Sequence, residues 1–105
     1  MYCRLTFGRV TSLKLKRNRI KAQLARVTSW KLRGKQISRL FVFDDFTDGI
    51  RFLNQVARLA EGMNHHPDID IRYNKVKLTL TTHDYGGLTM KDFKLAGKID
   101  RLKRS

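Results

Sequence analysis

The chain has 105 residues, of which 41% are hydrophobic, and a formal net charge of +14 at pH 7. This length accommodates one domain with a core of its own, and the hydrophobic share is ordinary for a globular protein. No apolar run is long enough to cross a membrane, which excludes a transmembrane class. The single cysteine, Cys3, cannot form an internal disulfide. We therefore expect a reducing intracellular compartment and interpret Cys3 as a bystander.

The positive charge is concentrated in the N-terminal part of the chain. Residues 1–43 hold 12 of the 23 Lys/Arg residues and none of the nine acids. The densest stretch consists of Lys14, Lys16, Arg17, Arg19 and Lys21. Three interpretations stay open: a solvated basic helix face, a surface for nucleic acid or an acidic partner, or the remnant of an organellar presequence. Few aromatic residues and no binding motif weigh against nucleic acid. We expect a cytoplasmic location, with nuclear and organellar locations left open.

Residues 1–10 are interpreted as an extended arm or an early strand. A helix over about 12–26 is predicted next, because apolar residues recur at helical spacing at Leu13, Ile20, Leu24 and Val27. Trp30 begins a short strand, and Gly34-Lys35 suits a turn. Residues 36–43 are rich in β-branched and aromatic side chains, so they complete a hairpin.

A second helix is predicted over about 45–62. Its start fits Asp44 or Asp45, whose carboxylate can cap a helix and meet the positive end of its dipole. It must end near His65-His66, because Pro67 disfavours helical geometry in the residue before it. The face expected to be buried consists of Phe46, Ile50, Leu53, Val56, Ala57 and Ala60.

Two strands and a final helix are predicted in the remainder. The strands cover 69–73 and 75–83, the second alternating between apolar and polar residues, and Tyr85-Gly86-Gly87 forms a loop. Thr89 and Asp92 resemble a capping box that opens a helix to about residue 102. Phe93, Ala96 and Ile99 are expected to face inward.

This order of elements predicts an α+β fold: a single two-layer domain over residues 1–105, with 1–11 as an arm or extension. Its four-stranded antiparallel sheet carries three helices on one face, in the order α-β-β-α-β-β-α. A sheet edge is left that another subunit could extend.

All three histidines of the chain, His65, His66 and His83, lie in one segment, together with Glu61 and Asp92. Imidazole changes its charge near neutral pH, which suits proton transfer. The fold can bring His83, at a strand exit, to the same end as the proline-fixed pair. A metal site is disfavoured because adjacent histidines converge poorly and no cysteine completes a shell. A Ser-His-Asp site lacks a nucleophile elbow. Metal-free acid–base chemistry, such as a dehydration, fits best.

The same segment resembles the signature of the pterin-4a-carbinolamine dehydratases. The resemblance covers about residues 24–102, and only the basic N-terminus departs from it, since members usually carry an acid-containing helix there. The matching residues are Glu61, His65-His66-Pro67, Tyr73-Asn74-Lys75-Val76, Leu80-Thr81-Thr82-His83 and Asp92, with Trp30, Ile37, Phe41-Val42-Phe43, Phe46, Ala60 and Gly87-Leu88-Thr89.

The resemblance implies conversion of 4a-hydroxytetrahydropterin to quinonoid dihydropterin, the recycling step after aromatic amino-acid hydroxylation. It implies no cofactor or metal, and a homodimer or homotetramer. The residues carried over are His65 and His83 as the acid–base pair, His66 as the group that binds and polarises the pterin, Glu61 and Asp92 as positioning acids, Pro67 as the loop-fixing residue, and Trp30 as a cleft wall.

Each of these roles has a structural alternative. Asp92 can be only a capping residue, and Glu61 only an acid at a helix end. Trp30 and Tyr73 can be core aromatics. A second function class also stays open: a binding module that uses the basic N-terminal region. The resemblance also implies such a role, because in animals the family's fold serves as a dimerisation cofactor of a homeodomain transcription factor.

Overall fold

The structure is a computed structural model that describes residues 14–104. The expected arm over residues 1–10, together with Cys3 and Leu13, lies outside the described residues. The elements are α1 (Arg17–Leu24), β1 (Lys31–Arg33), β2 (Gln36–Val42), α2 (Phe46–Met63), β3 (Asp68–Arg72), β4 (Lys75–Leu80), a 3-10 turn η2 (His83–Tyr85) and α3 (Met90–Arg104). The predicted order of helices and strands is therefore confirmed for this part of the chain.

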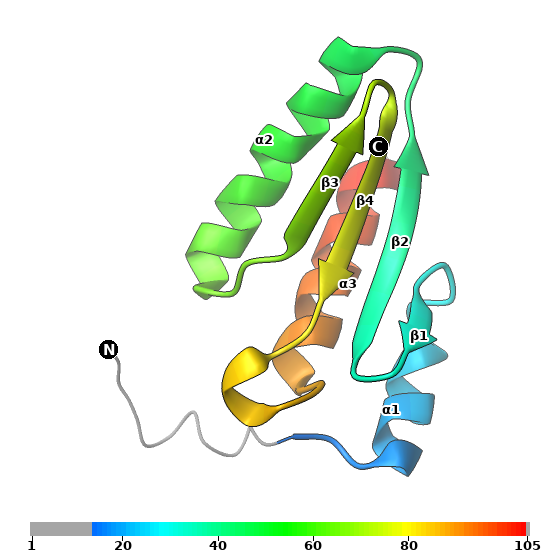
Figure 1. Cartoon of the computed structure of the whole chain (residues 1–105), viewed down its shortest axis with the longest axis vertical. Coiled ribbons are helices and arrows are strands. Elements are labelled where there is room, and N and C mark those ends of the chain that lie inside the picture. The colour runs from blue at the N-terminus through cyan, green and yellow to red at the C-terminus, as the bar shows by residue number, and fades with distance from the viewer. Residues whose placement is uncertain (1–13, 105) are drawn as a thin grey trace.

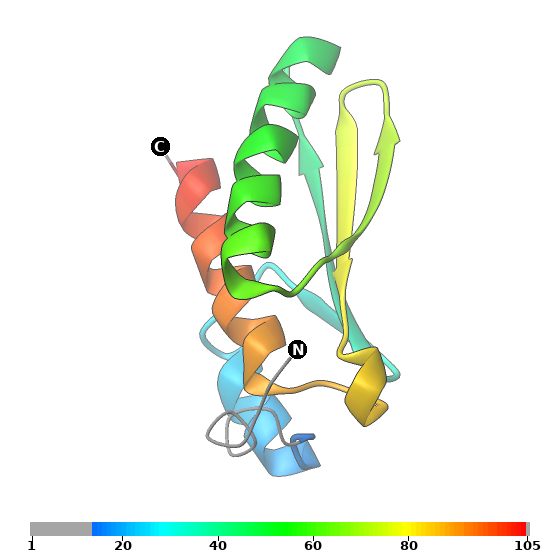
Figure 2. The same ribbon diagram turned by 90° about the vertical axis from the view of Figure 1, so that its left-hand side faces the viewer.

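The four strands form one antiparallel sheet in the order β1-β2-β4-β3. The long central strands pair from Ile37 opposite Leu80 to Val42 opposite Lys75. The sheet lies in front of the helices in Figure 1, and the view turned by 90° in Figure 2 shows α2 and α3 on one side of it. The expected two-layer α+β architecture is correct.

The core lies between the inner face of the sheet and helices α2 and α3. Alternate strand residues point into it because side chains of a strand alternate between faces. Phe52 of α2 packs between two aromatic rings of the sheet side, with ring centroids 4.8 Å from Phe41 and 5.0 Å from Phe43. The fully buried strand and helix residues include Ile37, Val56, Val76, Leu78, Leu80, Leu95, Ala96 and Ile99.

The buried face of α2 differs from the predicted one. Phe46 is 48% exposed and Ala57 is exposed, whereas Gly49 and Phe52 are buried. The helix begins at the predicted place, because the carboxylate of Asp45 accepts a hydrogen bond from the N–H of Asp48 at 2.8 Å. The face of α2 that contacts the sheet is rotated about the helix axis relative to the predicted face. The helix approaches β4 closely at Gly49, where an added Cβ would lie 3.4 Å from Val76.

Helix α1 is shorter than predicted. It spans Arg17–Leu24, and no residue of it is fully buried. Lys16 is extended, and the N–H of Leu15 donates to the carbonyl of Leu88 at 2.8 Å, so this stretch pairs with the loop before α3 instead of continuing a helix. Ile20 and Leu24 pack against the core as expected.

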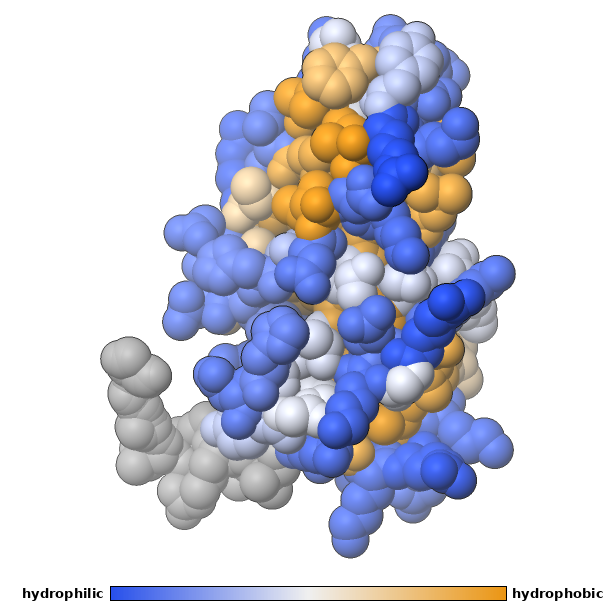
Figure 3. All heavy atoms as spheres, viewed as in Figure 1, coloured by the Kyte–Doolittle hydropathy of each residue, from blue (hydrophilic) through white to orange (hydrophobic). Residues whose placement is uncertain are grey.

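No helix of residues 14–104 covers the opposite face of the sheet (Figure 2). Figure 3 looks onto it and shows a mostly hydrophilic surface with hydrophobic residues gathered in its upper part. Leu40 and Val42 are 55% and 52% exposed, and both occupy outward positions of β2. Among the described helices, none combines the length and hydropathy that a membrane crossing requires.

Candidate active site

Helix α2 ends immediately before the two adjacent histidines. Asn64 adopts the left-handed conformation with φ of 51°, and its N–H donates to the carbonyl of Glu61 at 3.2 Å. The N–H of His65 donates to the carbonyl of Ala60 at 3.0 Å. These two bonds make a Schellman motif, and asparagine tolerates its left-handed position better than most residues. His65 is thus fixed by the helix end, and Pro67 follows in the extended segment that leads to β3.

His65 is held by a buried carboxylate. Its Nε2 lies 2.6 Å from Oδ1 of Asp92. The side chain of His65 is 10% exposed and that of Asp92 is fully buried. The contact joins the loop after α2 to the first turn of α3. The two residues are 27 positions apart in the sequence, and the fold brings them into direct contact.

Asp92 both caps α3 and belongs to the histidine network. Its Oδ2 accepts hydrogen bonds from the N–H of Thr89 and the hydroxyl of Thr82, each at 2.9 Å. The hydroxyl of Thr89 accepts from the N–H of Lys91 at 3.3 Å, which completes the predicted capping box. Since Oδ1 remains for His65, the two alternatives for Asp92 are not exclusive.

His66 contacts Glu61 through its Nε2, across the end of α2. Both side chains are exposed. An exposed pair of this kind contributes only about 0–1 kcal/mol to stability, so the contact orients His66 more than it stabilises the fold. The two adjacent histidines therefore project differently, His65 inward and His66 to the surface.

His83 begins η2 directly after the strand region and is exposed. The preceding residue, Thr82, exchanges two backbone hydrogen bonds with Gly87, at 3.1 and 3.3 Å, and closes the loop. Because the side chain of Thr82 also contacts Asp92, His83 is one residue away from the network that holds His65. The third histidine therefore lies at the same end of the sheet as the first two.

The structure does not place Trp30 with the histidines. It is 3% exposed, and its Nε1–H donates to Asp100 at 2.8 Å, which also accepts from Arg39 at 2.6 Å. Its ring meets Phe41 edge-on at 6.2 Å. The core interpretation accounts for these contacts, and a role of Trp30 in binding substrate stays a prediction. For Tyr73 the core interpretation is wrong: it is 67% exposed in the turn between β3 and β4, with φ of 53°.

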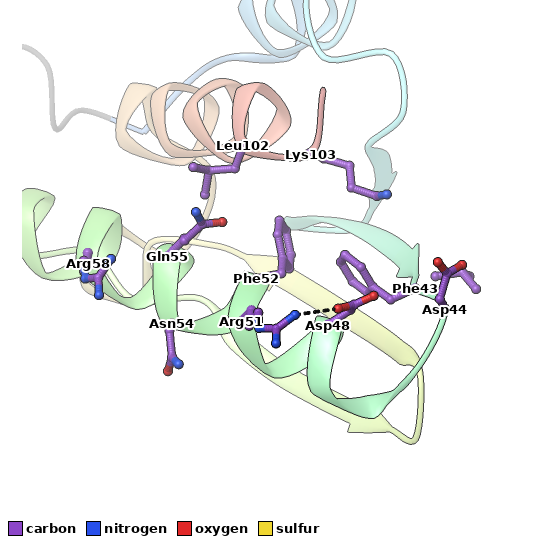
Figure 4. Close-up of a pocket in the computed structure, with 11 residues that line it drawn as sticks. Phe43, Asp44, Asp48, Arg51, Phe52, Asn54, Gln55, Arg58, Leu102 and Lys103 are labelled. Atoms are coloured by element: carbon purple, nitrogen blue, oxygen red, sulfur yellow. Dashed lines mark hydrogen bonds and ion pairs between the residues drawn. The ribbon is translucent and has the colours of Figure 1, made fainter. Parts of the chain in front are cut away.

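A groove of about 630 Å³ lies at the other end of the sheet. It is formed by the end of β2, the first half of α2 and the end of α3, and it contains no histidine. Figure 4 shows Phe43 and Phe52 in it and the ion pair between Arg51 and Asp48, whose nearest N and O atoms are 3.1 Å apart. At this end Val42 pairs with Lys75, the first residue of β4. His83 comes after Leu80, the last residue of β4, and so lies at the opposite end of the strand. This groove therefore lies away from the predicted active site.

The arrangement suits proton exchange. Two imidazoles are each oriented by a carboxylate, one buried and one exposed, and a third is open to solvent. Within residues 14–104 no three His, Cys, Asp or Glu side chains lie close enough to hold a metal ion.

Comparison with known families decides where the chain belongs. The family profile described as pterin 4 alpha carbinolamine dehydratase matches residues 13–102. The chain belongs to the pterin-4a-carbinolamine dehydratase family. Two relatives provisionally named pterin-4-alpha-carbinolamine dehydratase, from Sulfurisphaera tokodaii and Chloroflexus aurantiacus, are 48% and 52% identical over 89 residues. Each match covers 85% of this chain and 96% of the relative. The expected enzyme class, a hydro-lyase of this dehydratase family, is thereby confirmed.

Solved structures agree with the dehydratase fold. The crystal structure of a transcriptional coactivator/pterin dehydratase from Brucella melitensis is 34% identical, with a TM-score of 0.81 over 85% of this chain and 97% of that one. A pterin dehydratase-like protein identified as a RuBisCO assembly factor in the alpha-carboxysome is 28% identical, with a TM-score of 0.62 over 73% and 92%.

Two residues of the candidate site were not singled out from the sequence as members of it. The hydroxyls of Thr82 and Thr89 lie 2.9 Å apart, and both are buried around Asp92. The available signal was their position: one precedes His83 and the other precedes the helix whose first turn carries Asp92. Only the fold shows that the two hydroxyls meet.

Proposed function

We propose that the chain dehydrates a 4a-hydroxytetrahydropterin to the quinonoid dihydropterin by acid–base catalysis. The observation that supports this most is the buried pair of His65 and Asp92, with the exposed His83 directly after Thr82, which also contacts Asp92. A buried carboxylate that orients an imidazole is a recurrent device for proton transfer. Membership of the dehydratase family supplies the reaction class.

In the proposed reaction His65 removes the proton from the pterin nitrogen next to the hydroxylated carbon, and a new C=N bond forms. His83 protonates the departing hydroxyl, so the C–O bond breaks and water leaves. His66 binds and polarises the pterin, with Glu61 as its positioning acid. The dehydration releases only water and needs no oxidant or reductant. We propose that neither a metal nor a cofactor takes part.

The wider setting belongs to the same proposal. We assign the reaction to tetrahydrobiopterin recycling after aromatic amino-acid hydroxylation, in the cytoplasm, with the chain acting as a homodimer or homotetramer. The edges that a second subunit could extend are β1 and β3, because each pairs with only one neighbour among the strands of residues 14–104.

Binding of a pterin at the histidines can be tested by NMR. Titration with a dihydropterin is expected to shift the imidazole resonances of His65, His66 and His83 with one common dissociation constant. The side-chain NH2 of Asn74, which donates to the carbonyl of Phe43 at the other end of the sheet, is expected to shift much less. Unmoved imidazoles at saturating pterin would place the binding site elsewhere.

A second function has its own supporting observation, a cationic pocket of about 290 Å³ beside α1. Four cationic and four aliphatic side chains line it, and no acid does. The lining residues are Lys14, Leu15, Arg17, Ile20, Lys21, Leu32, Gly34, Lys35, Gly87 and Leu88. We infer that it binds an acidic protein segment with an apolar anchor residue, since aliphatic walls without aromatic rings suit such a side chain better than a stacked base. Two solved structures of this fold are named a transcriptional coactivator/pterin dehydratase and a RuBisCO assembly factor, which is consistent with a protein partner for this chain.

A short fluorescent peptide of alternating Glu and Leu can test this pocket by anisotropy. The double variant Lys21→Glu with Lys35→Glu is expected to weaken binding by about tenfold or more, because like charges then meet. The matched control, Lys94→Glu with Lys98→Glu on the exposed side of α3, makes the same change of net charge and is expected to weaken it far less. Equal losses in both variants, or equal binding of a Glu-Ser peptide, would contradict a specific pocket.

A further inference from the structure

The hydroxyl of Thr82 has only one proton to donate, and that proton is directed at Asp92. The bond from Thr82 to Oδ2 of Asp92 is 2.9 Å long, so the 2.9 Å contact between the two threonine hydroxyls must be donated by Thr89. The hydroxyl of Thr89 in turn accepts from the N–H of Lys91. The bonds therefore run in one direction, from the backbone of α3 through two hydroxyls to the carboxylate.

These donors determine how Asp92 faces His65. Oδ2 accepts from both the backbone N–H of Thr89 and the hydroxyl of Thr82, which leaves Oδ1 for the imidazole. The two donors and the start of α3 both stabilise the negative charge of the carboxylate. Since a carboxylate only accepts hydrogen bonds, Nε2 of His65 must carry the proton.

We propose that Thr82 and Thr89 are positioning residues that fix His65 in its Nε2–H tautomer and leave Nδ1 as the nitrogen that takes the substrate proton. Nδ1 has no hydrogen-bonding partner within residues 14–104, whereas Nε2 is used in the buried pair. The claim that Nδ1 accepts a proton from the pterin rests on the proposed dehydration. The claim about the tautomer of His65 rests only on the hydrogen-bond network. The two claims can therefore fail separately.

The substitution Asp92→Asn reverses the tautomer if the network is as described. The donors on Oδ2 hold the amide oxygen on their side, which turns the amide NH2 group toward His65. Because NH2 donates, Nε2 must then accept, and the proton of the imidazole moves to Nδ1. Thr82→Val removes one of the two donors that position the carboxylate, while Thr82→Ser keeps it.

Imidazole ¹⁵N NMR on the full chain, in a buffer alkaline enough for neutral histidines, reads the tautomer directly. We expect His65 to be the Nε2–H form in the unmodified chain and in Thr82→Ser, and the Nδ1–H form in Asp92→Asn. An Nδ1–H form in the unmodified chain, or an unchanged tautomer in Asp92→Asn, would overturn the proposal even if the chain is a good dehydratase.

Kinetics complete the test for Thr82. Thr82→Val is expected to lower kcat by about tenfold, which corresponds to about 1.4 kcal/mol of the barrier, with little change in KM. Thr82→Ser is expected to restore the rate. A Thr82→Val variant with full kcat, or a loss that Thr82→Ser shares, would show that the hydroxyl does not position the base. Should Thr82→Val fail to fold, the spectra of the unmodified chain and of Asp92→Asn still decide the tautomer.

Discussion

Replacement of His65 by alanine is expected to lower dehydratase turnover by about a hundredfold or more while the chain remains folded. The imidazole of His65 is the proposed base. Within residues 14–104 no second imidazole contacts Asp92, so no other histidine can take its place. His83→Ala is expected to have an effect of the same order, because it removes the proposed acid. The measurement is stopped-flow dehydration of a synthetic 4a-hydroxytetrahydropterin, with circular dichroism to verify the fold.

The matched control for these variants is Tyr73→Phe. Tyr73 belongs to the same sequence signature but lies exposed in the turn between β3 and β4. Its loss of a hydroxyl is expected to leave turnover within about twofold of the unmodified chain, since it makes no contact with the histidine network. Full activity in both histidine variants would remove the acid–base proposal, whereas a loss in Tyr73→Phe would show that the site extends to the turn.

The largest effect on stability is expected for Asp92→Ala. Its fully buried carboxylate accepts from Thr89, Thr82 and His65, and all three donors lose their partner in the variant. We expect the free energy of unfolding to fall by about 3 kcal/mol, because unpaired buried donors and a lost helix cap both cost free energy. Urea unfolding followed by fluorescence of Trp30 measures this.

Glu61→Ala is the control for that measurement, because Glu61 also contacts a histidine but is exposed. Its cost is expected to stay below about 0.5 kcal/mol. If both variants lose similar stability, burial of the Asp92 network is not what holds the loop, the strand exit and α3 together.

The sequence predicted the architecture well because its periodicities are local. The alternation along Lys75–Leu80 and the Thr89 to Asp92 capping pattern each depend on neighbours a few positions apart. Helix α1 was predicted too long because the apolar spacing used for it begins at Leu13, whereas the N–H of Leu15 pairs with the carbonyl of Leu88. That competition comes from a segment more than seventy residues away, and no local pattern reports it.

For the candidate active site, the sequence identified the three histidines and the two acids. It did not show which of these side chains contact each other. Histidines and carboxylates are recognisable by type, whereas the pairing of His65 with Asp92 depends on how α2 and α3 pack. The threonines were overlooked as site residues because a hydroxyl in a strand exit or at a helix cap is ordinary on its own. The buried position of Trp30 likewise depends on Asp100, two turns along α3 from Asp92.

The proposed dehydration itself is tested most directly by one rate. Dehydration of 4a-hydroxytetrahydropterin should be measured by stopped flow with and without the unmodified chain, after treatment of the chain with a metal chelator. We expect the rate to rise in proportion to the concentration of the chain and to be unaffected by the chelator. A rate equal to that of buffer alone, at any concentration of folded chain, would contradict the proposed function.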